Sequence, residues 1–294
     1  MSPARAAVAL SACLVAISAV GGADGRSFDY SEIVVPGATF ANAQGINAAG
    51  DVVGAYRDAT GKVRGFLSSR GVVSSIEYPG AAVTEARGIG PQGVIVGTYR
   101  MAGEPSVNAH GFRLAVDGTF TNVDYPGHTN TIAQRILPNG TILGCRHDHD
   151  TMQTMRGVVI PADGPPSETD TFASMHNGAS PDGSRVVGFF MDMMTGRSES
   201  YVIDKGEFTA FAVPGSTLTS AWDVNARGEI VGVYRDAATR VHGFLRDGEH
   251  YTTLDFPGAA ITRAFGINAG GDVVGAFVDG TGRTGAFIAR RTGR

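Results

Sequence analysis

One motif recurs along this chain at a nearly fixed spacing, and this recurrence limits the folds that the chain can adopt. The stretch GINAAGDVVGAYRD at 45–58 matches GINAGGDVVGAFVD at 266–279 at 11 of 14 positions. A shorter form, an apolar pair followed by glycine, occurs six times and ends at Gly54, Gly97, Gly144, Gly188, Gly232 and Gly275. These glycines are 43, 47, 44, 44 and 43 residues apart. Such periods are typical of solenoids and propellers.

Each period divides into four short segments with the composition of β-strands. In the last period, TRAFGIN (262–268), DVVGAFVD (272–279) and RTGAFIAR (283–290) are separated by glycine-rich turns. A segment of the fourth type is HYTTLDFPG (250–258). Apolar, β-branched and aromatic residues fill the segments, and no stretch has a helical period. Four strands in about 44 residues is the size of one propeller blade.

The order of the segments predicts a closed ring. After its first residues, the chain starts with a segment of the fourth type (28–37) and ends with one of the third type (285–290). In an open stack, this offset would leave two unpaired strand edges, whereas in a ring residues 28–35 pair with residues 284–289. The sequence therefore predicts an all-β fold, a six-bladed β-propeller of four-stranded blades that is closed by the N-terminal strand.

The first 23 residues have the organisation of a secretory signal peptide. Arg5 precedes an uncharged apolar run at 6–20, which is short for a membrane span, and small residues follow at 21–23. We predict a signal peptide at 1–23 and one propeller domain at 24–294. The mature chain is then a secreted monomer, extracellular or periplasmic, without a membrane span. A net charge of −4 and the absence of a basic run argue against a nucleic-acid partner.

The repeats resemble those of the HAF family of extracellular repeat proteins, which carry a His-Ala/Gly-Phe step. The corresponding steps here are HGF at 110–112 and 242–244, RGF at 64–66 and GAF at 285–287. The GIN, VVG and PGA motifs also resemble that family, and the resemblance covers residues 28–290. It implies secretion and a repeated β architecture. It implies no reaction, because the family has no catalytic motif to carry over.

Positions that vary between repeats are the candidates for function. One position in the first segment of a repeat is Ala in five of the six repeats, and the residue after it is chemically diverse. This diverse position holds Gln44, Arg87, Gln134, Asn177, Trp222 and Phe265. Amides beside aromatic rings suit a sugar or another small polar ligand at the mouth of a propeller channel. The alternative is packing between neighbouring blades.

A second candidate site is rich in histidine and methionine. The sequence HDHD places His147, Asp148 and His149 side by side, and His176 replaces the usual alanine in the fourth repeat. Imidazole with carboxylate suits Zn or Cu(II), and the thioethers of nearby methionines suit Cu(I). A polar, solvated turn is the alternative, so no cofactor is certain. Cys145 occupies a mostly apolar position, which predicts a buried, unreactive thiol.

The sequence contains no nucleophile elbow, phosphate loop or HExxH motif. It therefore predicts a secreted binding or interaction module for a glycan, a small polar ligand or a protein partner. One alternative is a hydrolase or lyase acting on polysaccharide, with His176, His147 and Asp148 as acid–base candidates. The other is a transition-metal protein that uses the His/Met-rich repeats. No catalytic residue can be assigned from the sequence.

Overall fold

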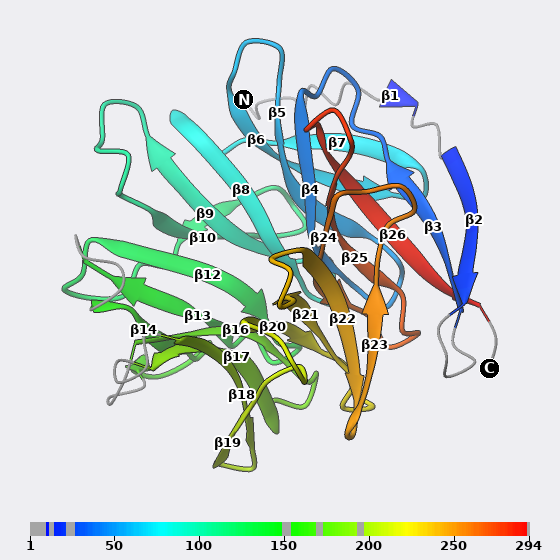
Figure 1. Cartoon of the computed structure of the whole chain (residues 1–294). Helices are drawn as coiled ribbons and strands as arrows, with labels where there is room; N and C mark the ends of the chain where they lie inside the picture. The colour runs from blue at the N-terminus through cyan, green and yellow to red at the C-terminus, as the bar shows by residue number, and fades with distance from the viewer. Residues whose placement is uncertain are drawn as a thin grey trace.

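The structure is a computed structural model that describes residues 10–11, 15–21, 27–148, 154–168, 173–192 and 197–292. The described residues form 26 β-strands, arranged in sheets around a common centre (Figure 1). Within these ranges, no helix has the length and apolar character needed to cross a membrane. The architecture is an all-β propeller built from four-stranded units.

Each unit is an antiparallel meander of four strands that starts near the centre and moves outward. The first unit comprises β4 (Phe40–Ile46), β5 (Val52–Arg57), β6 (Val63–Ser69) and β7 (Val72–Ile76). The second comprises β8 (Ala81–Ile89), β9 (Ile95–Met101), β10 (His110–Leu114) and β11 (Phe120–Asn122). The third comprises β12 (Asn130–Ile136), β13 (Ile142–His147), β14 (Arg156–Ile160) and β15 (Ser167–Glu168).

The second half of the chain repeats this plan. The fourth unit comprises β16 (Ser174–Ala179), β17 (Arg185–Asp192), β18 (Arg197–Asp204) and β19 (Glu207–Phe211). The fifth comprises β20 (Leu218–Val224), β21 (Ile230–Arg235), β22 (Val241–Asp247) and β23 (His250–Leu254). The last unit comprises β24 (Ile261–Ile267), β25 (Val273–Val278) and β26 (Thr284–Thr292). Three strands come from the first part of the chain: β1 (Leu10–Ser11), β2 (Val15–Gly21) and β3 (Ser27–Ile33).

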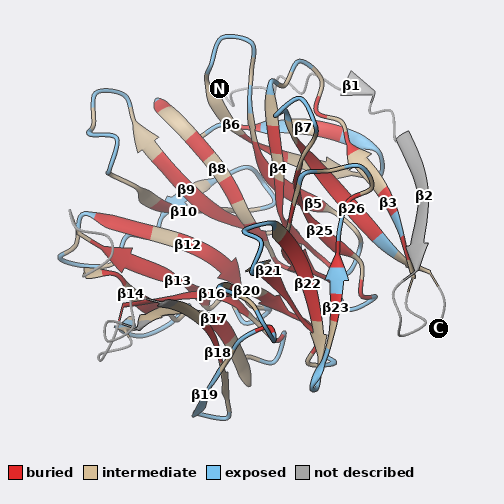
Figure 2. Cartoon of the chain, viewed as in Figure 1, coloured by how far each residue is buried: buried red, intermediate tan, exposed pale blue. Residues whose placement is uncertain are grey.

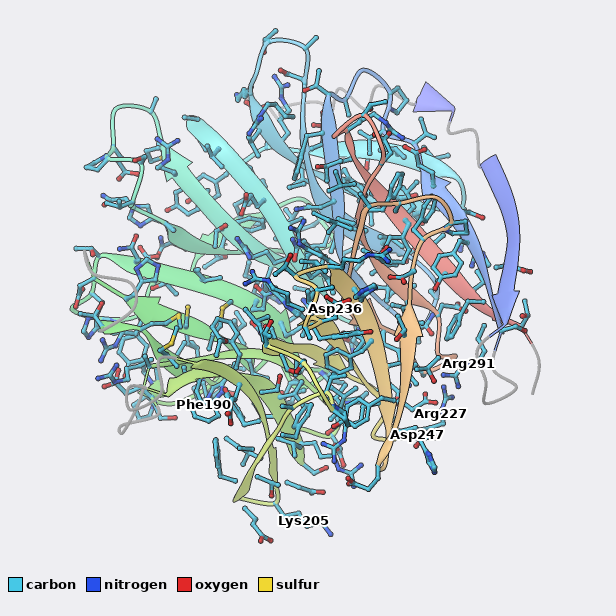
Figure 3. The ribbon with its side chains drawn as sticks, in the orientation of Figure 1. Phe190, Lys205, Arg227, Asp236, Asp247 and Arg291 are labelled. Carbon is cyan, nitrogen blue, oxygen red and sulfur yellow. The ribbon has the colours of Figure 1, made fainter. Side chains whose placement is uncertain are left out.

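An early strand and the last strand of the chain pair in one sheet. Strand β3 pairs antiparallel with β26, with Ile33 opposite Ala286 and Ser27 opposite Thr292. The innermost strands β4, β8, β12, β16, β20 and β24 each contact the next, and β24 contacts β4. The end of β26 also contacts the neighbouring sheet, because Arg291 Nη2 lies 2.9 Å from Glu229 Oε1. Glu229 Oε2 is paired in turn with Arg227 Nη2 at 2.6 Å. Figure 3 labels Arg227 and Arg291 at the same end of the molecule.

The sheet topology corrects the prediction of six separate four-stranded blades closed by the N-terminal strand. The described strands form five hydrogen-bonded sheets, of four, four, four, five and nine strands. The nine-stranded sheet arises because β6 and β8 share a parallel pair between Val63 and Val83. The N-terminal strands β1 and β2 lie outside, on β7 and β3, so the strand that joins β26 is the third in the chain. Open strand edges bind further strands, and repeat spacing does not reveal which edges do so.

The glycine of the VVG motif is explained by the packing within each unit. A Cβ atom on Gly232 would overlap the carbonyl oxygen of Ser220 and lie 2.6 Å from the ring of Phe244. The equivalent rings Phe66, Phe112 and Phe287 are, like Phe244, fully buried. Figure 2 shows that burial is concentrated along the inner strands. The glycine of the recurring motif therefore leaves room for one aromatic ring in the middle of the unit, except in the third unit, where Val158 occupies this position.

The HGF step at 110–112 places the His110 side chain between two carboxylates. His110 Nδ1 lies 2.7 Å from Asp124 Oδ2, and His110 Nε2 lies 3.1 Å from Glu104 Oε1. A neutral imidazole has only one N–H, so two carboxylate partners favour the imidazolium form. Burial alone would lower the pKa of His110, but the bonds to Asp124 and Glu104 outweigh it and raise the pKa above 6.5.

We call a basic side chain held between two carboxylates in this way the clamp. Other units contain the clamp with other residues. His242 lies between Asp255 and Asp236. Arg64 fills the position in the first unit, between Asp58 and Glu77, and Arg283 contacts Glu32 and Asp279. The clamp ties the turn after the second strand to the outermost strand, which is a structural role.

This clamp predicts a pH-dependent contribution to stability. Because the folded-state pKa of His110 is raised, the stabilisation is fully present below pH 6.5 and is lost as the pH rises through the folded-state value. His110→Arg reproduces the first unit and stays charged, so the wild type should lose up to about 1 kcal/mol relative to this variant on passing from pH 6 to pH 9. Urea unfolding of both proteins across this range measures the difference. Parallel pH profiles would contradict the assignment.

Candidate functional site

A β-bulge lies at the same place in every innermost strand. The pairing with the next strand skips one residue, as between Ala43 and Gly45 in β4 and between Ala221 and Asp223 in β20. The skipped residues are the six members of the diverse position, which we name the channel ring: Gln44, Arg87, Gln134, Asn177, Trp222 and Phe265. A bulge redirects a side chain out of the normal strand alternation. The structure thus explains why this position differs from its neighbours.

The first four units contribute a polar arc to the channel ring. Arg87 donates from Nη1 to Gln134 Oε1 at 3.2 Å and from Nη2 to Glu85 Oε2 at 2.6 Å. Asn177 donates from Nδ2 to the carbonyl oxygen of Ala221 at 2.7 Å. Gln134 and Asn177 are fully buried, and Gln44 is 8% exposed. The amide groups of Gln134 and Asn177 are therefore held in fixed orientations inside the molecule.

The last two units contribute an aromatic arc. The rings of Trp222 and Phe265 meet edge to face, with centroids 4.7 Å apart and an angle of 65° between their planes. Phe265 is buried, whereas Trp222 and Arg87 are partly exposed. The channel ring is therefore in contact with solvent at these two side chains. Its residues contact neighbouring units and also carry polar groups, so they combine features of the packing role and of the binding role predicted from the sequence.

Three polar atoms of the channel ring have no hydrogen-bond partner within the described residues. They are Gln44 Oε1, Gln134 Nε2 and Asn177 Oδ1, and each is completely buried. The orientations of Gln134 and Asn177 are determined by the bonds that their other amide atoms make. A buried polar group without a partner costs roughly 1–3 kcal/mol. Such groups are rare in native proteins, and they mark functional sites or positions where a water, ion or ligand binds.

The residue after each channel-ring position was missed by the sequence reasoning. Four units have glycine here, at Gly45, Gly88, Gly178 and Gly266, while the third has Arg135 and the fifth has Asp223. An arginine and an aspartate at a position that is otherwise glycine indicate, already in the sequence, that the two side chains form an ion pair. In the structure, Arg135 Nε lies 3.5 Å from Asp223 Oδ1, and each side chain is 9% exposed.

The Arg135 guanidinium is bound by backbone carbonyl groups of four innermost strands. Nη1 donates to the carbonyl oxygens of Arg87 at 2.8 Å and Gln134 at 3.0 Å. Nη2 donates to those of Gln44 at 3.0 Å and Phe265 at 2.5 Å. The planar fork of five donors makes such a junction possible for arginine and not for lysine.

Asp223 completes this junction from the fifth unit. Its carboxylate accepts from the backbone N–H of Val224 at 3.0 Å and of Ile267 at 3.1 Å. Burial raises the pKa of Asp223 in spite of the opposing effect of Arg135. Glycine at the neighbouring positions provides the space, because a Cβ on Gly178 would lie 2.6 Å from Asp223.

A cavity of about 320 Å³ lies beyond this pair, at the ends of the innermost strands. Its walls are mainly apolar and include Ile46, Ile136 and Ile267. Arg135 and Asp223 line it, whereas no residue of the channel ring does. The ion pair therefore separates the channel ring from this cavity. Both terminal nitrogens of Arg135 donate to backbone carbonyl groups. Nε lies 3.5 Å from Asp223 Oδ1 and makes no hydrogen bond within the described residues.

The predicted metal ligands have protein partners where the structure describes them. His147 is buried and its Nδ1 lies 3.1 Å from the carbonyl oxygen of Asp148, while the Asp148 carboxylate lies 3.1 Å from His128 Nδ1. His176 Nδ1 lies 2.5 Å from the hydroxyl of Tyr201. His149 lies outside the described residues. Within the described ranges, no three His, Cys, Asp or Glu side chains are grouped to hold a metal, so the metal site stays a prediction.

Packing accounts for His176 in the position that is alanine elsewhere. A Cβ on Gly157 in the preceding unit would lie 2.8 Å from the imidazole, so glycine leaves room for the larger side chain. Burial lowers the pKa of His176 to about 4, so the ring is neutral. Cys145 is buried and free, as predicted, and burial raises the pKa of its thiol to about 12.

The fold is similar to solved propeller structures. AofleA from Arthrobotrys oligospora has a TM-score of 0.55 at 12% identity, over 90% of this chain and 88% of that one. The β-propeller domain of the Trilobed protease from Pyrococcus furiosus has 0.52 at 13% identity, over 87% and 95%. The Aleuria aurantia lectin, in complex with Fucα1-6GlcNAc, has 0.51 at 11% identity, over 85% and 94%. No family model and no curated protein matches the chain. These similarities establish the fold alone.

The Arg135–Asp223 pair predicts a strong, non-additive effect on stability. Arg135→Gly leaves a buried carboxylate without its partner, and Asp223→Gly leaves a buried guanidinium without its own, so each should cost about 3–5 kcal/mol. The double variant recreates the glycine found in the other four units, and its loss should be smaller than the sum by more than about 1 kcal/mol. Urea unfolding of the four proteins gives the coupling energy. Additive losses would show that the two charges do not act as a pair.

Proposed function

We propose that this protein is a secreted binding module whose channel ring receives a neutral, hydroxyl-rich ligand, such as a sugar. The observation that carries the proposal is a set of three buried amide atoms, Gln44 Oε1, Gln134 Nε2 and Asn177 Oδ1, which have no hydrogen-bond partner in the described part of the chain. They offer two acceptors and one donor. A hydroxyl group both donates and accepts, so it can satisfy amide oxygens and an amide N–H together.

The charges around the channel ring favour a neutral ligand. Arg87 is paired with Glu85, and Arg135 is paired with Asp223 and four carbonyl groups. A charged ligand would have to compete with these pairs. The Trp222 and Phe265 rings give the opposite side an apolar surface, which suits the C–H face of a sugar. Few, well-placed polar groups beside apolar walls are the usual composition of a small-molecule site.

The comparisons support a binding role in general terms. One structural neighbour is a lectin in complex with a fucose-containing disaccharide. The leader-like residues 1–23 and the resemblance of the repeats to the HAF family support secretion to the extracellular space or periplasm. We infer a monomer that binds a glycan or another small polar ligand, with a protein as the second candidate partner.

Trp222 provides a direct readout, because it is the single tryptophan of the chain and belongs to the channel ring. Titration with a panel of neutral mono- and disaccharides should give a saturable change in its fluorescence. Gln134→Leu and Asn177→Leu keep Trp222 but remove the polar partners, so they should weaken the response by at least about tenfold. Gln134→Leu removes the unsatisfied Nε2 but also the Oε1 acceptor of the Arg87 hydrogen bond, so the free energy of unfolding should change by less than about 1 kcal/mol.

The exposed Gln92, outside the channel ring, provides the matched control, and Gln92→Leu should titrate like the wild type. Identical titrations of the Gln134→Leu variant and the wild type would contradict a site in the channel ring. A panel in which no sugar changes the Trp222 signal would contradict the proposed ligand class.

A further inference from the structure

Another position at which one unit departs from the repeat pattern lies in the third strand of the second unit, next to the third unit. The residue after the central aromatic position of each third strand is apolar in five units, where it is Leu67, Val159, Val202, Leu245 and Ile288. In the second unit it is Arg113. Register confirms the equivalence, because Arg113 lies opposite Val96 just as Leu245 lies opposite Val231 and Ile288 opposite Val274.

In four of the other units this position belongs to the core between neighbouring units: Leu67, Val202, Leu245 and Ile288. Leu245 packs with Ala264 and Ile267 of the following unit, and it is fully buried. Ile288 packs in the same way with Ala43 and Ile46. Arg113 therefore stands where an apolar contact between two units is expected. Val96, its neighbour across the sheet, faces the third unit and packs with Ala133 and Ile136.

A cavity of about 630 Å³ lies between these two units. Its apolar wall includes Val94, Val123, Ile136, Ile142 and Ile160, and among the described residues Arg113 is the one charged residue that lines it. This volume is within the range of small-molecule sites. The interval between Gly97 and Gly144, which spans this junction, is also the longest of the five. The replacement of a core residue by arginine thus coincides with an open space.

The Arg113 guanidinium has no hydrogen-bond or ion-pair partner among the residues that the structure describes. By contrast, Arg64, Arg146 and Arg185 each contact a carboxylate. Guanidinium binds carboxylate through two parallel hydrogen bonds, and an apolar environment strengthens such bonds. An unpaired arginine on an apolar wall is suited to a ligand that carries one negative charge.

We propose that the cavity between the second and third units binds a small carboxylate with an apolar body. The carboxylate pairs with Arg113, and the hydrocarbon part lies against Val123, Ile136 and Ile160. A single guanidinium without a second cation in the lining matches a monoanion rather than a phosphate dianion. The site is separate from the channel ring and does not depend on the proposed sugar binding.

Octanoate and octanol are the matched probes, because they share the hydrocarbon chain and differ in charge. Calorimetric titration of the wild type should show saturable octanoate binding, at least about tenfold tighter than that of octanol. Arg113→Leu installs the residue found in the first and fifth units. It should bind octanoate at least about tenfold more weakly and should unfold at an equal or higher urea concentration.

The exposed Arg240 provides the charge-matched control, and Arg240→Leu should bind octanoate as the wild type does. Equal octanoate affinity in the wild type and Arg113→Leu would overturn the proposal. So would the absence of octanoate binding, or octanol binding as tightly as octanoate. The Trp222 response to sugars should be unchanged in Arg113→Leu, so failure of one proposal is distinguishable from failure of the other.

Discussion

The arrangement of the centre depends on one buried guanidinium. The Arg135 guanidinium donates hydrogen bonds to backbone carbonyl oxygens of the strands β4, β8, β12 and β24, and it forms an ion pair with Asp223 of β20. Five of the six innermost strands are thereby joined at one point. The other four units keep glycine at this position, since the two side chains need the space around the axis. The same junction divides the interior, with the channel ring on one side and the smaller apolar cavity on the other.

The repeats act as internal controls for one another. Positions that hold the same kind of residue in most units have a structural explanation. Examples are the VVG glycine beneath the aromatic ring and the basic side chain between two carboxylates. Positions that break the pattern divide into two kinds. His176 is compensated by Gly157 and Tyr201, so its break is a packing adjustment. The amides of the channel ring and Arg113 lack such compensation, and these uncompensated breaks are where we infer ligand binding.

The sequence predicted the propeller fold and the four strand segments, because both follow from local composition and spacing. It did not predict the division into sheets, which depends on contacts such as Val63–Val83 that form only when edges meet in space. The channel ring was identified by its diversity, although the bulge behind it was not. Arg135 and Asp223 were overlooked, since pairing across about 90 residues is invisible until the units are arranged around an axis. Only the three-dimensional structure reveals which buried amide atoms have no hydrogen-bond partner among the described residues.

A high-resolution crystal structure tests the central claim most directly, because it shows what the buried amides contact. The account predicts the Arg135 guanidinium on the axis, bonded to the carbonyls of Gln44, Arg87, Gln134 and Phe265. It also predicts an ordered water or ligand within hydrogen-bond distance of Gln134 Nε2 and Asn177 Oδ1. Amide side chains that bond to each other around an empty centre, or Arg135 turned away from the axis, would contradict it.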